Sequence, residues 1–289
     1  LDCPYYEQMM YVGDTRVEML VAYVMSLDTR LTRRGIELFD WSRWKTGFIA
    51  GRCPSQPYQL SLTFSTIWPY MVHDYMMWRG DREWVTARLT GMRCLIENFL
   101  PLCNSDGLLE NLPGWSFVDW VDDWHGGVPA DGRSGVSSII NLQFVLTLRY
   151  AAAIEHWAGD TAMARRYIAL ADAIGRAVVE RFWHAGSDRL ADDLSHAHFS
   201  EHAQALAILG EVLNEEHTRA ALNTLEHDQD LARTTVYYSF YLLEAFAKLG
   251  RGDLIEKRLA FWQTLIDLDM NTPVEKPEPS RSDCHAWGA

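Results

Sequence analysis

Three carboxylates and three tyrosines share the short segment from residue 2 to residue 14. The carboxylates belong to Asp2, Glu7 and Asp14, and Pro4 disfavours helix at the residue before it. Gly13 followed by Asp14 predicts a chain break and then a helix N-cap, so residues 2–12 are expected to form an irregular strap across the mouth of the fold. Packing cannot satisfy three carboxylates, so we expect the strap to bind or cleave a polar ligand.

Two later segments also combine acids with tryptophan: residues 115–124 and residues 275–287. Paired carboxylates are what glycoside hydrolysis requires, since one protonated group assists the leaving oxygen while an ionised group activates water or attacks the anomeric carbon. Tryptophan offers a flat apolar face that suits the C–H face of a sugar ring. The candidate residues of these segments are Trp115, Asp119, Trp120, Asp122, Asp123, Glu275, Glu278, Asp283, His285 and Trp287.

The neighbouring residues predict different environments for the three aspartates of residues 115–124. Asp119 lies between Val118 and Trp120 and is therefore expected to point inward, where it could contact substrate. Asp122 and Asp123 are expected in a solvated turn.

Apolar residues recur at helical spacing in ten segments, and almost no segment alternates like a strand. Gly80-Asp81, Gly159-Asp160 and Gly252-Asp253 each predict a helix that ends at glycine and a next helix capped by aspartate. The predicted helices cover residues 14–27, 29–43, 62–79, 81–101, 136–158, 160–183, 197–212, 214–225, 234–249 and 251–268.

Short and long connections alternate strictly between these helices. In an antiparallel array, this parity places every long connection at one end, together with the strap and the tail from residue 269 to 289. Five hairpins plus one helix missing from each terminus would make an all-α, six-hairpin toroid, the (α/α)6 barrel. We therefore expect a single domain over residues 1–289, excised from a longer chain.

Composition excludes several classes of partner. The chain of 289 residues has 39 acidic and 26 basic side chains, a net charge of -13. A nucleic acid or an anionic membrane surface is therefore not an expected partner. No apolar run approaches about 20 residues, so no membrane span is expected. A neutral ligand fits better.

Five cysteines are present, without a C-x-x-C pair, at positions 3, 53, 94, 103 and 284. This pattern predicts neither a disulfide framework nor a zinc knuckle, and it favours a reducing compartment such as the cytoplasm, with a secreted or periplasmic location left open. Asp283, Cys284 and His285 are consecutive and so are poorly spaced to chelate one ion. His198 and His202 have helical spacing and are interpreted as a solvated helix start. No metal and no cofactor are expected.

The segment from Asp2 to Arg16, which includes the strap, resembles the signature of α-L-rhamnosidases of glycoside hydrolase family 78. The resemblance lies in Asp2-Cys3-Pro4-Tyr5-Tyr6-Glu7-Gln8 and in Gly13-Asp14-Thr15-Arg16. The tail from Glu275 to Trp287 resembles that family's second signature. The resemblance implies an (α/α)6 catalytic domain that hydrolyses terminal α-L-rhamnosides with inversion. It also implies a rhamnose-containing glycoside or oligosaccharide as the ligand and flanking β-sandwich domains in the full-length parent.

The resemblance further implies a role for each site residue. Glu7 would be the general acid and Glu275 the general base acting through water, with Glu278 as the alternative base. Asp2 and Asp14 would hold the rhamnose hydroxyls. The sugar pocket would be completed by Trp115, Asp119, Trp120, His285 and Trp287.

Three other readings remain open. Another (α/α)6 glycosidase could act on fucosides, glucosides or unsaturated uronides, although Arg281 is the only basic residue close to the tail motif that could hold a uronide carboxylate. A catalytically inactive carbohydrate-binding toroid would keep the tryptophans and lose one of Glu7 and Glu275, yet both are present. A cyclase or prenyltransferase would require a zinc or magnesium-diphosphate site that the sequence does not offer.

Overall fold

The structure is a computed structural model that describes residues 2–5, 8–56, 58–276 and 284–288. Helices dominate it, and their order along the chain is α1 (Val12–Met25), α2 (Arg30–Trp41), α3 (Leu62–Arg79), α4 (Arg82–Thr86), α5 (Leu89–Phe99), α6 (Ser138–Ala158), α7 (Thr161–Phe182), α8 (Glu201–Leu209), α9 (Glu215–His227), α10 (Val236–Lys248) and α11 (Gly252–Asp267). Short 3-10 turns are η1 (Leu100–Leu102), η2 (His125–Gly127) and η3 (Ala286–Gly288).

Four two-residue strands complete the described elements. β1 (Met10–Tyr11) pairs antiparallel with β2 (Arg52–Cys53), and β3 (Trp183–His184) pairs antiparallel with β4 (Arg189–Leu190). The first pair anchors the end of the N-terminal strap to the loop between α2 and α3.

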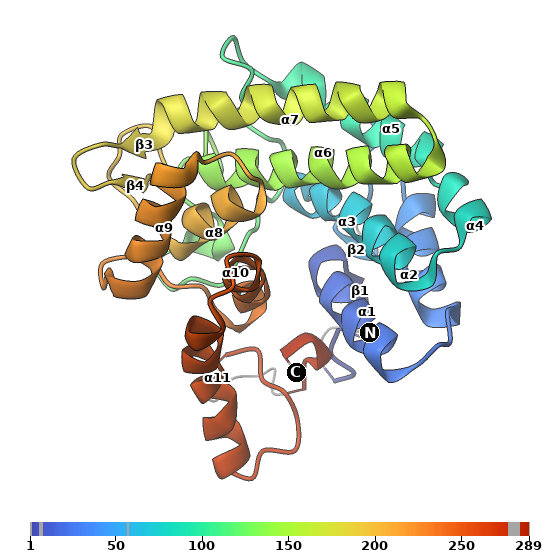
Figure 1. The fold of residues 1–289 in the computed structure, drawn as a ribbon. Coiled ribbons are helices and arrows are strands. Elements are labelled where there is room, and N and C mark those ends of the chain that lie inside the picture. The colour runs from blue at the N-terminus through green and yellow to red at the C-terminus, as the bar shows by residue number, and fades with distance from the viewer. Residues whose placement is uncertain (1, 6–7, 57, 277–283, 289) are drawn as a thin grey trace.

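The helices form an inner curved row and an outer layer (Figure 1). Along the inner row α1 contacts α3, α3 contacts α6, α6 contacts α8 and α8 contacts α10. The outer helices α2, α5, α7, α9 and α11 each pack on an inner neighbour. Residues 138–148 of the inner helix α6 are all buried, whereas the outer helix α7 buries a single stripe.

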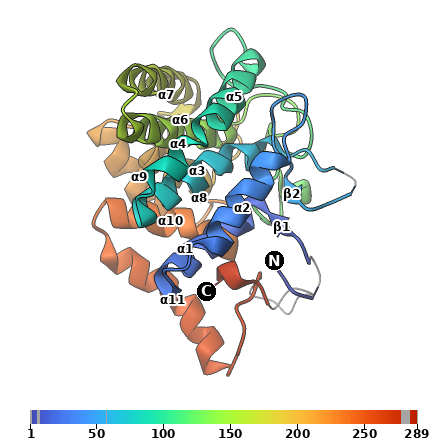
Figure 2. The same cartoon turned by 90° about the vertical axis from the view of Figure 1, so that its right-hand side faces the viewer.

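The C-terminal turn η3 lies between the two ends of the inner row, where it contacts both α1 and α10. The strap and the tail therefore lie near each other in both views, although they come from opposite ends of the chain (Figure 1, Figure 2). This arrangement confirms the all-α toroid predicted from the alternation of short and long connections.

Two of the three predicted glycine-aspartate junctions are confirmed. Gly80 and Gly159 adopt the left-handed conformation at helix ends, with φ of 66° and 101°. Asp81 caps α4 by accepting a hydrogen bond from the Trp84 amide at 3.1 Å, and Asp160 caps α7 in the same way. The turns therefore form where aspartate can satisfy amides that the helix leaves open.

The third junction was placed wrongly. The left-handed residue after α10 is Gly250, and Asp253 lies inside the first turn of α11 rather than before it. The predicted helix over residues 81–101 is also divided, into α4 and α5. No helix in the described part of the chain combines the length and apolar character needed to cross a membrane.

The predicted break at Gly13 is wrong as well. The first helix starts at Val12, and Gly13 and Asp14 lie in its first turn. A Cβ atom at position 13 would lie 2.2 Å from the Tyr237 hydroxyl and 2.9 Å from the Phe64 ring. Glycine therefore fits here because the Tyr237 and Phe64 side chains approach α1 closely, not because the chain turns.

A buried ion pair fixes α1 against α3 inside the toroid. The Arg16 Nε atom lies 2.9 Å from an Asp74 carboxylate oxygen, and its guanidinium faces the rings of Tyr70 and Tyr241. Burial is the largest influence on the pKa of Asp74 and would raise it, but the Arg16 charge together with hydrogen bonds from His73 and Arg16 outweighs burial, so the pKa is lowered. The pair orients the helix that carries Asp14.

Candidate active site

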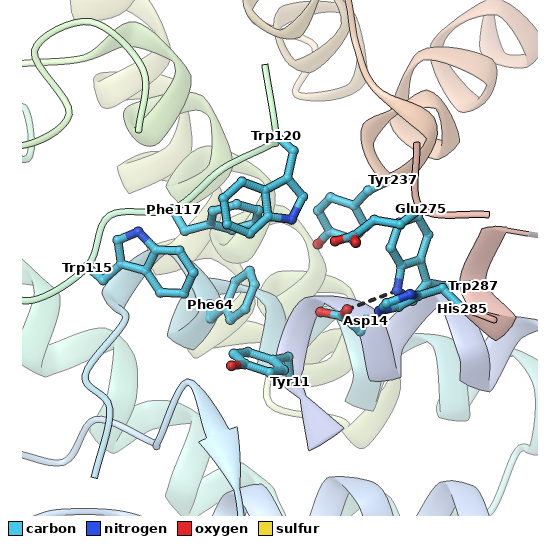
Figure 3. Close-up of a pocket in the computed structure, with 10 residues that line it drawn as sticks. All are labelled: Tyr11, Asp14, Phe64, Trp115, Phe117, Trp120, Tyr237, Glu275, His285 and Trp287. Atoms are coloured by element: carbon cyan, nitrogen blue, oxygen red, sulfur yellow. Dashed lines mark hydrogen bonds between the residues drawn. The ribbon is translucent and has the colours of Figure 1, made fainter. Parts of the chain in front are cut away.

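A pocket opens on the face where the loops preceding the inner helices meet. Its empty volume, which includes space open to solvent, is about 510 Å³. The side chains that line it come from both chain ends and from the loops and first turns of three inner helices (Figure 3): Tyr11, Asp14, Phe64, Trp115, Phe117, Trp120, Tyr237, Glu275, His285 and Trp287.

A hydrogen bond joins the two ends of the chain at this pocket. The Trp287 Nε1 atom donates to the Asp14 Oδ1 atom at 2.9 Å, and the His285 ring packs against Trp287 with centroids 5.0 Å apart. The predicted meeting of the strap and the tail is therefore confirmed, and it brings Asp14, His285 and Trp287 together.

The carboxylates near the pocket are desolvated. Burial raises the pKa of Asp14 to about 7, with a further increase from the Glu18 and Glu275 charges that its hydrogen bonds only partly offset. Burial likewise raises the pKa of Glu18, one helical turn later, to about 7. The pKa of Asp2 is raised well above its usual range, mainly by burial and to a smaller extent by the charges of Asp14 and Glu18. Such perturbed acids are typical of functional sites.

Asp2 lies beside the lining rather than in it. It is fully buried, and its Oδ2 atom accepts a hydrogen bond from the Tyr11 amide at 2.5 Å. Its backbone amide donates to the Met9 carbonyl at 3.0 Å, and the Gln8 amide donates to the Cys3 carbonyl at 3.0 Å. In this structure Asp2 therefore folds the strap and holds Tyr11 at the wall.

An aromatic wall stands on the other side of the pocket (Figure 3). The Phe117 ring contacts both tryptophans, with centroids 4.9 Å from Trp115 and 4.9 Å from Trp120. The Trp115 Nε1 atom donates to the Gly126 carbonyl at 2.8 Å, which fixes the ring. Both tryptophans are half-buried and so present a face to the pocket, where the sequence placed them.

Asp119 points inward as predicted, but it points away from the pocket lining. Its carboxylate accepts hydrogen bonds from the His202 Nε2 atom at 2.7 Å and from the Thr235 amide at 2.9 Å, besides the Thr235 hydroxyl. Direct contact with a ligand would require one of these bonds to break, so the substrate contact of Asp119 stays a prediction. Asp122 and Asp123 are exposed, as expected.

The structure corrects the interpretation of His198 and His202 as a solvated helix start. His198 is largely exposed, but His202 is completely buried against Asp119 and is not part of a solvated helix start. Among the described residues, no group of three or more histidine, cysteine, aspartate or glutamate side chains is arranged to hold a metal ion.

Of the two glutamates expected to be catalytic, the structure describes Glu275 only. Glu275 is half-buried and lines the pocket, with its carboxylate pointing into the same space as Asp14 (Figure 3). Glu7 lies outside the described residues, as do Glu278, Arg281 and Asp283.

Sequence reasoning did not select Phe64 and Tyr237 as pocket residues. Both are buried and look like core side chains, with exposed fractions of 2% and 4%. Each lies in the first turn of an inner helix, directly after a long connection. The loop parity that located the site could therefore have identified them, because the first turn of each inner helix faces the same end.

Loss of a pocket tryptophan is expected to affect ligand use more than folding. Trp120→Ala should lower kcat/KM at least tenfold with little change in melting temperature, because the half-buried ring faces the pocket. Trp68→Ala is the matched control, since Trp68 is fully buried and its loss should cost about 3–5 kcal/mol of stability. Early melting of Trp120→Ala with unchanged kinetic constants would place Trp120 in the core.

The raised pKa of Glu18 predicts stability that falls as pH rises. The unfolded carboxyl ionises near 4.5 and the folded one near 7, so the folded state holds an extra proton in between and loses this advantage as pH rises through that interval. Glu18→Gln should therefore be more stable than the parent at pH 8, by about 2 kcal/mol, and should lose that advantage at pH 4. Thermal melts across this range measure the difference, and exposed Glu256→Gln is the control. An equal effect of Glu18→Gln at both pH values would contradict the prediction.

A model of one protein family matches most of the chain. Residues 1–256 match the domain described as the bacterial alpha-L-rhamnosidase 6 hairpin glycosidase domain, a range that ends before the tail. No curated protein matches the chain.

Solved structures share the fold. The GH78 family rhamnosidase of Bacillus sp. GL1 superposes with a TM-score of 0.89 at 24% identity, covering 100% of this chain and 31% of that one. A rhamnosidase from Klebsiella oxytoca with rhamnose bound gives 0.86 at 20% identity, covering 99% and 57%. The GH63 mannosylglycerate hydrolase of Thermus thermophilus in complex with glucose gives 0.67 at 10% identity, covering 100% and 93%. The chain thus spans about a third to just over half of the two rhamnosidases.

Proposed function

The chain belongs to the bacterial alpha-L-rhamnosidase six-hairpin glycosidase domain family, and from this premise we propose that it is the catalytic domain of an enzyme that hydrolyses terminal α-L-rhamnosides with inversion. In this proposal Glu275 is the general base and Glu7 the general acid. A rhamnose-containing glycoside or oligosaccharide is the substrate.

The observation that carries the proposal is the composition of the pocket formed by both chain ends. Glu275 and Asp14 share it with an aromatic wall and with His285. Rhamnose has a C6 methyl group and C–H groups beside several hydroxyls, so it needs an apolar surface and polar partners in one small space. The pocket offers tryptophan faces for the first and a carboxylate and an imidazole for the second.

The proposed mechanism assigns a task to each group. Glu275, ionised, takes a proton from a water molecule as that water attacks the anomeric carbon, while Glu7 donates a proton to the leaving oxygen. Inversion requires room for the water, which corresponds to carboxyl groups roughly 6.5 to 9.5 Å apart. Asp14 is held by the Trp287 indole N–H. Because burial raises its pKa to about 7, its carboxyl group can accept a hydrogen bond from a sugar hydroxyl when ionised or donate one when protonated.

Asp2 and Asp119 act one step away from the sugar in this proposal. Asp2 folds the strap that brings Tyr11 to the wall, and Asp119 fixes the loop that carries Trp120 through its bonds to His202 and Thr235. Their replacement is therefore expected to disturb the shape of the pocket rather than to remove a sugar contact.

A panel of nitrophenyl glycosides tests the proposed activity. The protein should release nitrophenol from the α-L-rhamnoside at least a hundredfold faster than from the α-L-fucoside or the α-D-glucoside. Preference for one of these would reassign the substrate to another glycosidase of this fold. Rhamnose binding in calorimetry without turnover of any rhamnoside would instead indicate an inactive carbohydrate-binding toroid.

A further inference from the structure

Two cysteines from opposite ends of the chain touch beside the pocket. The Sγ atoms of Cys3 and Cys284 lie 2.7 Å apart, although the two residues are separated by 281 positions in the sequence. Both residues are thiols in this structure. A disulfide bond holds its sulfurs about 2.05 Å apart, so the two atoms need to approach by less than about 1 Å to bond.

Each cysteine is fixed to one of the two segments that form the pocket. The Cys3 carbonyl accepts a hydrogen bond from the Gln8 amide, and this bond closes the strap next to Asp2. On the other side Cys284 precedes His285, whose amide donates to the Pro273 carbonyl at 3.2 Å. The contact therefore joins the segment that carries Glu7 in the sequence to the tail that presents Glu275 and His285.

We propose that Cys3 and Cys284 form a disulfide bond under oxidising conditions, and that this bond locks the N-terminal strap to the C-terminal tail across the site. Such a bond closes a loop of nearly the whole chain, and the constraint on the unfolded state grows with loop length. It would replace contacts between two terminal segments, which separate readily in most folds, by a covalent link.

The chemistry requires a thiol–disulfide exchange partner, for which glutathione disulfide is the class. Cys284 is half-buried and Cys3 fully buried, so the first attack falls to Cys284. Its thiolate displaces one glutathione as a thiol and forms a mixed disulfide. The Cys3 thiolate then attacks the Cys284 sulfur and releases the second glutathione. Two protein thiols lose two protons and two electrons, and the small disulfide gains them as two thiols.

Intact mass and melting temperature test the proposal on the full chain. After incubation with glutathione disulfide, the mass should be lower than that of the dithiothreitol-treated protein by about 2 Da, the two lost hydrogens. Peptide mapping without reduction should recover the strap peptide joined to the tail peptide. The oxidised protein should melt roughly 5 °C or more above the reduced one.

Variants separate this bond from any other oxidation. Cys3→Ser and Cys284→Ser should each abolish both the joined peptide and the difference between oxidised and reduced melting temperatures. Cys94→Ser, which removes an exposed cysteine far from the pair in sequence, should keep both. Because oxidised and reduced forms are compared within each variant, a general loss of stability does not obscure the result. Folded protein that gains only glutathione adducts, or that joins other cysteines, would overturn the proposal.

Discussion

Replacing Glu275 with glutamine is expected to lower kcat on an α-L-rhamnoside by about 10²- to 10⁴-fold, the usual contribution of a general base. Glutamine keeps the shape of the half-buried side chain but cannot accept the proton of the attacking water. Steady-state kinetics measure the loss, and far-ultraviolet circular dichroism should show the same helical spectrum as the parent.

Glu278→Gln is the matched control, because this glutamate belongs to the same tail and is the alternative base. It should retain activity within a few fold of the parent. The opposite pattern, with a large loss for Glu278→Gln and a small one for Glu275→Gln, would transfer the role of base to Glu278.

Glu7→Gln is expected to give a loss that depends on the leaving group. On an alkyl rhamnoside, whose leaving oxygen needs a proton, kcat should fall by about 10²- to 10⁴-fold. On a dinitrophenyl rhamnoside, whose leaving group departs without protonation, the loss should be much smaller.

The pH dependence of kcat/KM tests independently whether Glu7 is the general acid. A general acid must be protonated, so kcat/KM of the parent should decline at high pH as the acid loses its proton. This basic limb should disappear in Glu7→Gln measured with the dinitrophenyl substrate. An unchanged basic limb, or equal losses on both substrates, would show that another residue protonates the leaving oxygen.

The positions of Asp14, Glu275, His285 and Trp287 could be predicted from the sequence because they depend on topology. Alternating short and long connections determine which end of an antiparallel array each loop occupies, and no side-chain detail is needed for that inference. The hydrogen bond from Trp287 to Asp14 then follows from two segments that the topology forces together.

The errors arose where a residue's role depends on a neighbour remote in sequence. Gly13 looks like a helix breaker, yet it lies in the first turn of α1, at a position where Tyr237, more than 200 positions later, leaves no room for a Cβ atom. His202 looks like part of a solvated helix start, yet its ring is completely buried against Asp119, more than 80 positions earlier. Local patterns do not contain these tertiary contacts.

The anomeric configuration of the first sugar released tests the central claim most directly. Proton NMR spectra taken within minutes of adding the protein to an α-L-rhamnoside distinguish the two anomers of free rhamnose before they equilibrate. Inverting hydrolysis predicts that β-L-rhamnose appears first and that the α-anomer follows by mutarotation. Initial release of α-L-rhamnose would show retention of configuration and would contradict a mechanism in which Glu275 activates water.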